Sequence, residues 1–141
     1  MKESFVSHCE GDTESLAMGF AKKLKSGDLV CFFGDLGAGK TAFVRAAVSV
    51  LCPDALVCSP TYAIMNEYIS PKFKVSHFDL YRIQSEDDLY SIGFDDYFDD
   101  ERIIFTEWSE NVKEFLPRPR YEITVTKTGE SERLFEIEYL E

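Results

Sequence analysis

The first half of the chain alternates between short apolar runs and segments in which apolar residues recur at helical spacing. Ser4 to Ser7 predicts a short strand. A helix is predicted to follow, capped by Asp12 or Thr13 and ended by residues 27–28. The apolar positions of this helix repeat every three to four residues, as a single buried face requires: Leu16, Ala17, Phe20, Ala21 and Leu24.

The run Leu29 to Phe33 is apolar throughout and bounded by turn residues, which is typical of a strand buried on both faces. Gly34 to Gly39 then forms a glycine-punctuated loop. Lys40 to Leu51 is apolar on nearly every side, so a deeply packed helix is expected there. We therefore predict a three-layer α/β fold in which Leu29 to Phe33 is the central strand, flanked by the helices that begin near Thr13 and Lys40.

The second half of the chain predicts mostly strands. Two of them are joined by a Ser-Pro-Lys turn and should form an antiparallel hairpin, so the sheet is expected to be mixed. A terminal hairpin is expected around Gly129. The predicted strands are Thr61 to Ile69, Phe73 to Asp79, Arg102 to Thr106, Tyr121 to Thr126 and Leu134 to Tyr139.

A short acidic helix is predicted to begin at Ser85 to Asp88. Between Glu86 and Glu101 the chain carries eight carboxylates and neither Lys nor Arg. Such a segment is either a solvated face or a surface for a partner or regulator, and the sequence leaves both open.

The 141 residues predict a single domain over 1–141, given roughly 150 residues per domain, and 45% hydrophobic residues are enough for a core. The net charge of −11 disfavours a protein whose own surface grips DNA or RNA, because phosphate binding needs a basic footprint. Partners are therefore expected among proteins and small ligands.

The four cysteines contain no CxxC pair, and only two histidines accompany them, so no structural zinc site is expected. Cys31 and Cys58 follow apolar residues and are interpreted as small buried hydrophobes. We see no signal peptide, and no apolar run approaches the ~18 residues of a membrane span. The sequence thus predicts a cytoplasmic protein with reduced thiols.

The segment Gly34 to Thr41 reads GDLGAGKT and satisfies the pattern G-x-x-x-x-G-K-[ST] between a predicted strand and a predicted helix. In this motif the backbone wraps a phosphate with its amide N–H groups, and the helix N-terminus adds a positive field. Lys40 should reach the β and γ phosphates, and the Thr41 hydroxyl should be a ligand of Mg²⁺. The loop residues expected against the nucleotide are Asp35, Leu36, Gly37, Ala38 and Gly39.

A magnesium–nucleotide site also needs a carboxylate at a strand end, and two candidates qualify. Glu107 ends the run Ile103 to Thr106, and its alternative role is a surface ion pair. Asp79 ends Val75 to Phe78, and its alternative is a turn residue. We assign Glu107 to the metal shell, because two carboxylates crowding one phosphate would oppose binding. Asp79 then orients the attacking water or couples the SPTY segment, residues 59–62, to the nucleotide. His77 is interpreted as a satisfied strand histidine rather than a catalyst.

Three further positions leave alternatives open. Thr61, within the SPTY segment 59–62, could sense the γ phosphate or simply mark a strand boundary set by its preceding proline. Arg82 could stabilise transition-state charge or form a salt bridge. Trp108 is interpreted as either a core residue or a stacking surface.

In this order and spacing, four motifs closely resemble the TsaE family, also called YjeE, over most of the chain: GDLGAGKT, SPTY, HFDLYR at His77 to Arg82, and EW at Glu107 and Trp108. The resemblance implies a small bacterial P-loop ATPase that acts with TsaD and TsaB. The product implied is N6-threonylcarbamoyladenosine at position 37 of ANN-decoding tRNAs, with the tRNA held mainly by the partner proteins.

The resemblance also implies roles for individual residues. Mg²⁺ would lie against Thr41 and Glu107, with Asp79 needed for ATP turnover. Thr13 and Arg133 match positions near the nucleotide base. Two other function classes remain open beside the ATPase: a small-molecule kinase, although no basic lid segment is present, and a nucleotide-controlled interaction protein with negligible turnover.

Overall fold

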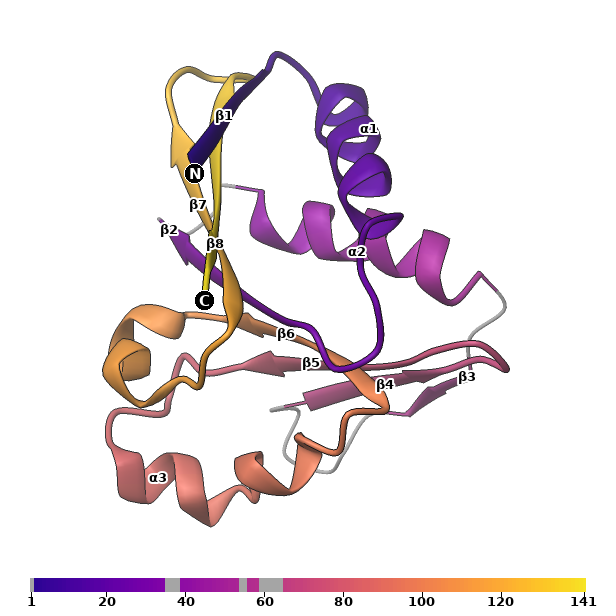
Figure 1. The fold of residues 1–141 in the computed structure, drawn as a ribbon. Helices are drawn as coiled ribbons and strands as arrows, with labels where there is room; N and C mark the ends of the chain where they lie inside the picture. The colour runs from indigo at the N-terminus through magenta and orange to yellow at the C-terminus, as the bar shows by residue number, and fades with distance from the viewer. Residues whose placement is uncertain (1, 35–38, 54–55, 59–64) are drawn as a thin grey trace.

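The computed structural model describes residues 2–34, 39–53, 56–58 and 65–141. Within them the strands form one mixed sheet in the order β1-β8-β7-β2-β6-β5-β4-β3 (Figure 1). The strands are β1 (Lys2–Ser7), β2 (Leu29–Gly34), β3 (Leu56–Cys58), β4 (Met65–Ile69), β5 (Lys74–Asp79), β6 (Arg102–Glu107), β7 (Arg120–Lys127) and β8 (Arg133–Leu140).

Parallel pairing is confined to the middle of the sheet, where β2 pairs with β6 and β7, and β5 pairs with β6. Toward both edges the pairing is antiparallel: β1 with β8, β7 with β8, β3 with β4, and β4 with β5. The prediction of a mixed sheet with β2 at its centre is therefore confirmed. The pairing also brings the carboxyl ends of β2, β5 and β6 to one edge, where α/β proteins place their ligands.

Helices cover the two faces of the sheet unequally (Figure 1). On one face lie α1 (Glu10–Ala21) and α2 (Lys40–Leu51), packed against each other and against the sheet. On the other lie the short helices α3 (Glu86–Ser91), η1 (Phe94–Tyr97) and η2 (Ser109–Phe115). The three layers are as predicted, but α1 and α2 do not flank the central strand from opposite sides. Hydrophobic periodicity shows that a helix buries one face and carries no information on which side of the sheet it lies.

The larger core is aromatic and centres on Phe43 of α2, which is fully buried. Its ring centroid lies 5.4 Å from that of Phe32 in β2, 5.5 Å from that of Phe135 in β8 and 5.9 Å from that of Phe20 in α1. Tilted and edge-on aromatic pairs at such separations are favourable beyond the area they bury. The start of α2, where the phosphate-loop motif ends, is thereby fixed to the rest of the fold.

The start of α1 differs from the prediction by three to four residues. Cys9 is the residue before the helix, and Asp12 lies within the first turn, where its carboxylate accepts the N–H of His8 at 2.9 Å. Thr13 is buried, and its hydroxyl is 2.6 Å from that of Ser7. The polar residues that resembled a cap in the sequence thus serve the helix start from inside its first turn.

Several other predictions can now be compared with the structure. The strand predicted from Thr61 is observed from Met65, and residues 61–64 lie outside the described part of the chain. The short edge strand β3 was not predicted. Cys31 is fully buried, and burial raises its pKa to about 12, whereas the side chain of Cys58 is not described. In the described residues, no helix has both the length and the hydropathy needed to cross a membrane.

Gly34, the last residue of β2, is expected to be irreplaceable. Its φ is +132°, and a Cβ there would lie 2.1 Å from the carbonyl oxygen of Val125 in β7. Gly34→Ala therefore forces the central strands apart and should lower the free energy of unfolding by about 2–5 kcal/mol through strain and overpacking. Urea unfolding measures this difference.

The matched control is Gly19→Ala in the middle of α1, where a new Cβ meets nothing within 4 Å. This change should raise the free energy of unfolding by roughly 0.5–1 kcal/mol through helix propensity. Equal unfolding midpoints for the two variants would contradict the close approach of β2 and β7 at Gly34.

Candidate functional site

The helix that the phosphate-loop motif predicts begins where expected. Gly39, with φ of 101°, is the residue before α2, and Lys40 and Thr41 form its first turn. The first N–H groups of a helix have no partner within it, so those at the start of α2 can bind a ligand. Residues 35–38, predicted to contact a nucleotide through their amides, lie outside the described residues, as does Thr61.

Lys40 is only 5% exposed, although it stands at the start of a helix. Its ammonium donates a hydrogen bond to the carbonyl oxygen of Gly34 at 2.9 Å and lies 4.2 Å from the ring centroid of Trp108. Neither contact neutralises the charge, and no ion pair to Lys40 is present among the described side chains. The start of α2 therefore carries a buried cation that could bind a phosphate.

Trp108 combines the two alternatives that the sequence left open. The indole is half-buried, with Lys40 over its face and Tyr81 at its edge, the two ring centroids 5.0 Å apart. Its backbone has a φ of 61°, a left-handed conformation that is unusual for a bulky residue. Strained residues of this kind are concentrated at functional sites. The turn after β6 thus places Trp108 against Lys40 at the start of α2.

Glu107 is the centre of a buried polar chain at the end of β6. One carboxylate oxygen, Oε1, accepts the hydroxyl of Thr41 at 3.2 Å, and the other, Oε2, lies 2.5 Å from Nε2 of His77. Burial opposes ionisation, but the hydrogen bond and charge of His77, the Thr41 hydroxyl and the charge of Lys40 outweigh it and lower the pKa of Glu107. Glu107 is therefore ionised at neutral pH, and the alternative of a surface ion pair is wrong.

The contact between His77 and Glu107 was not predicted, since His77 was interpreted only as a satisfied strand histidine. Strand alternation did place it on the face of β5 that also carries Val75 and Asp79. Its partner, however, lies 30 residues later in the chain. The HFDLYR motif was a signal for the position, but no pattern in the sequence indicated what the ring would touch.

Asp79 ends β5 directly beside Glu107 in the parallel register of β5 and β6. Its side chain is exposed, and its carboxylate accepts the N–H of Tyr81 at 3.0 Å. The turn role considered for Asp79 is thus present in the structure. Arg82 is exposed and, among the described residues, forms no ion pair, so the salt bridge considered for it is not observed.

The oxygens of Thr41 and Glu107 fit the magnesium ion that the motif implies. Thr41 Oγ1 and Glu107 Oε1 are 3.2 Å apart. Neighbouring ligands of an octahedral Mg²⁺, each at about 2.1 Å, are about 3.0 Å apart, so both oxygens fit one ion. Among the described side chains no group of three His, Cys, Asp or Glu residues could hold a metal by itself. Such a site suits an ion that takes most of its ligands from phosphates and water.

Thr13 and Arg133 come together although 120 positions separate them in the sequence. With Gly39 they line a pocket of about 400 Å³ beside the start of α2, a volume suited to a small ligand. The Arg133 guanidinium is held by the carbonyl oxygens of three residues of the β7–β8 turn, at 3.0–3.3 Å. The remaining residues of the lining were not predicted, since nothing in the sequence joins them: His8, Cys9, Glu10, Ala42 and Ser131.

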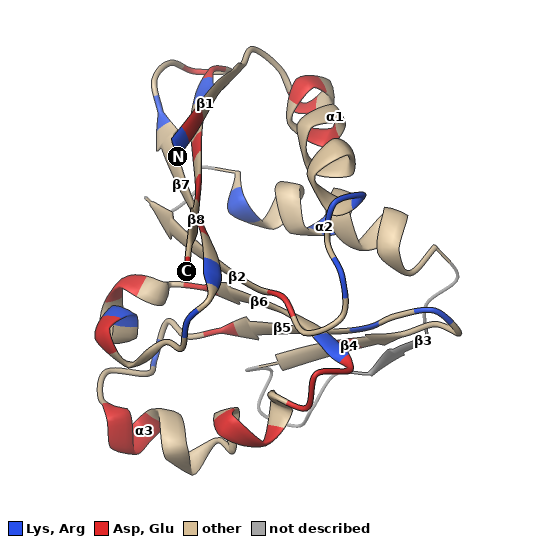
Figure 2. Ribbon diagram, in the orientation of Figure 1, with Lys and Arg blue, Asp and Glu red and all other residues tan. Residues whose placement is uncertain are grey.

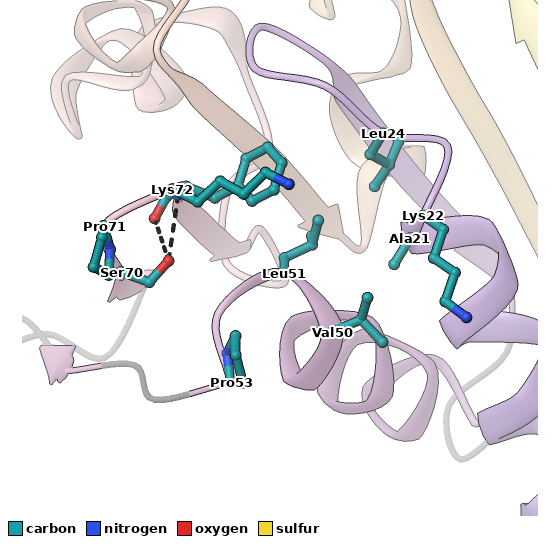
Figure 3. Close-up of a pocket in the computed structure, with 10 residues that line it drawn as sticks. Ala21, Lys22, Leu24, Val50, Leu51, Pro53, Ser70, Pro71 and Lys72 are labelled. Carbon is teal, nitrogen blue, oxygen red and sulfur yellow. Dashed lines mark hydrogen bonds between the residues drawn. The ribbon is translucent and has the colours of Figure 1, made fainter.

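A second pocket, of about 440 Å³, lies at the opposite ends of α1 and α2, against the turn between β4 and β5 (Figure 3). Its lining is largely apolar and includes none of the predicted site residues. Figure 2 shows that α3 and η1, which are rich in acidic residues, lie on the opposite side of the sheet from α1 and α2. Lys40, Thr41, Asp79 and Glu107 lie instead at the edge where β2, β5 and β6 end.

Comparisons with known proteins agree on one family. A family model described as "Threonylcarbamoyl adenosine biosynthesis protein TsaE" matches residues 7–135. A protein of Rickettsia prowazekii named "tRNA threonylcarbamoyladenosine biosynthesis protein TsaE" is 37% identical over 127 residues, covering 89% of this chain and 88% of the relative. One of the same name from Aquifex aeolicus is 43% identical over 111 residues, covering 77% of each chain.

The fold has a solved counterpart as well. The crystal structure of Bacillus subtilis YdiB superposes with a TM-score of 0.82 and 26% sequence identity, covering 100% of this chain and 87% of the other. The α/β arrangement is therefore a P-loop NTPase-like fold, as the sequence predicts.

Proposed function

Because the chain belongs to the TsaE family of tRNA threonylcarbamoyladenosine biosynthesis proteins, we propose that it binds and hydrolyses Mg-ATP in that pathway. The modification concerned is the threonylcarbamoyl group on adenosine 37 of ANN-decoding tRNAs. The observation that carries the proposal is the convergence of Lys40, Thr41 and Glu107 at the start of α2, where a cation, a hydroxyl and an ionised carboxylate meet beside the phosphate-loop motif.

Phosphate binding begins with an exchange of partners at Lys40. The ammonium leaves the Gly34 carbonyl and the face of Trp108 for the β and γ phosphates, where a charge-assisted hydrogen bond is stronger than one to a neutral carbonyl. The N–H groups at the start of α2 face the same phosphates. Lys40 thus orients the triphosphate and draws charge from it.

Thr41 and Glu107 would hold the magnesium ion through the two oxygens that are now joined by a hydrogen bond. The ion would supply positive charge to offset the charge on the phosphates during hydrolysis. Asp79, at the adjoining strand end, orients the water that attacks the γ phosphate or couples segment 59–62 to the nucleotide. The pocket of Thr13 and Arg133 receives the nucleoside.

We further propose that the protein acts with TsaD and TsaB in the cytoplasm and contacts tRNA only through that complex. The net charge of −11 supports this division, because a strongly acidic chain attracts no nucleic acid by itself. The same charge speaks against DNA and against anionic membrane surfaces as partners.

The test is phosphate release from ATP by the chain alone, with purified TsaD and TsaB, and with both partners and tRNA. We expect slow release alone and at least about tenfold faster release in the full mixture, together with modified tRNA. Transfer of the γ phosphate to a small acceptor would favour a kinase. Tight nucleotide binding without release in any mixture would favour a nucleotide-controlled interaction protein.

A further inference from the structure

His77 is a buried ionisable group for which the proposed function gives no role. Its side chain and that of Glu107 are each 10% exposed, and the two meet at 2.5 Å across the parallel pair β5 and β6. Since an ionised carboxylate can only accept hydrogen bonds, Nε2 of His77 carries the hydrogen. The ring therefore takes one carboxylate oxygen of Glu107 and leaves the other to Thr41.

A glutamate side chain has three rotatable bonds, so its carboxylate needs a hydrogen-bond partner to fix its direction, even at a buried strand end. The ring of His77 rotates about two bonds, and its backbone is fixed between β4 and β6. Anchoring Oε2 on this ring selects one orientation of the carboxylate plane, the one in which Oε1 lies 3.2 Å from Thr41. In this orientation Oε1 of Glu107 and Oγ1 of Thr41 both fit a single Mg²⁺.

We infer that His77 is a positioning residue, which holds the Glu107 carboxylate ready for the magnesium ion of a bound nucleotide and does not itself touch that ion or the nucleotide. The inference rests on the proposed function. Removing a residue that hydrogen-bonds a metal ligand commonly weakens metal affinity by about 10–100-fold.

Packing does not account for a histidine at this position. Val75, two residues earlier on the same strand and facing the same way, is fully buried in the aromatic core, so an apolar residue is compatible with this face of β5. The histidine is therefore explained by the hydrogen bond between its Nε2 and Glu107, and not by packing alone.

The test compares three variants of the full chain with the wild type. His77→Gln keeps an amide nitrogen at about the reach of Nε2, His77→Asn keeps the amide but is too short, and His77→Leu removes the donor. Binding of a non-hydrolysable ATP analogue is measured by calorimetry, first in excess EDTA and then over a Mg²⁺ titration. Val75→Ala is the control, because it weakens the same strand without touching Glu107.

We expect His77→Leu and His77→Asn to raise the Mg²⁺ concentration for half-maximal binding by about 10–100-fold, while metal-free binding changes less than about twofold. His77→Gln should recover most of the loss, and Val75→Ala should leave the Mg²⁺ dependence unchanged. If His77→Leu does not fold, the difference in Mg²⁺ dependence between His77→Gln and His77→Asn tests the inference.

Three outcomes would overturn the inference. The Mg²⁺ dependence of His77→Asn could equal that of the wild type, the loss could extend equally to metal-free binding, or Val75→Ala could produce the same shift. A wild-type chain that binds no magnesium nucleotide would instead contradict the proposed function, and this result is obtained before any variant is compared.

Discussion

Lys40→Ala is expected to abolish ATP turnover while the protein remains folded. The ammonium is the cation that we propose binds the phosphates, and it is held by a neutral carbonyl and an aromatic face rather than by a carboxylate. Removing a single preorganised donor to transition-state charge typically costs about a hundredfold to a thousandfold in rate. Phosphate release in the presence of TsaD, TsaB and tRNA measures the loss.

The stability of Lys40→Ala should change much less. The variant loses one hydrogen bond to Gly34 and the contact with Trp108, together about 1–2 kcal/mol of unfolding free energy. Lys113→Ala is the matched control, since that lysine also lies over an aromatic ring, that of Phe33 at 5.2 Å, and is paired with Glu122. Turnover by Lys40→Ala within a few-fold of the wild type would mean that the loop is structural.

Glu107→Ala and Asp79→Ala are expected to fail at different steps. Glu107 is buried and bonded to Thr41, so its loss should raise the Mg²⁺ requirement for nucleotide binding by about 10–100-fold. Asp79 is exposed at the neighbouring strand end, so its variant should bind Mg-ATP nearly normally and lose hydrolysis. Nucleotide titrations with and without Mg²⁺, followed by single-turnover hydrolysis, separate the two steps.

Asp79→Asn sharpens this comparison, because an amide oxygen can still accept the N–H of Tyr81 and preserve the turn. If Asp79→Asn hydrolyses ATP normally while Asp79→Ala does not, the carboxylate acts only through the turn. The reverse pattern, with weak magnesium binding in Asp79→Ala and lost hydrolysis in Glu107→Ala, would exchange the two roles.

Features that depend on neighbouring residues could be predicted from the sequence. The run Leu29 to Phe33, the glycine loop and the helix from Lys40 are contiguous, and each is encoded by local backbone preference and hydrophobic spacing. Glu107 was found as a candidate because a carboxylate directly after an apolar strand must lie at the end of that strand. The mixed sheet followed from the hairpin signals in the second half of the chain.

The start of α1 marks the limit of local reasoning. Asp12 and Thr13 have the composition of a helix cap, but Thr13 is buried against Ser7, and the helix begins at Glu10. The side of the sheet on which α1 and α2 lie was likewise undetermined. Both depend on which surface is available for burial, and that is a property of the assembled layers.

The sequence by itself determined the strand before the GDLGAGKT motif, the helix that begins at Lys40 and the α/β class of the fold. The tertiary structure alone decided what these residues touch: His77 and Glu107 are 30 positions apart, and Thr41 and Glu107 are 66 positions apart. Such pairs depend on strand order and register, which place β6 between β2 and β5. Hydrophobic periodicity indicates whether a side chain is buried. It does not indicate a partner so far along the chain, because that contact forms only when the strands pair in their final order and register.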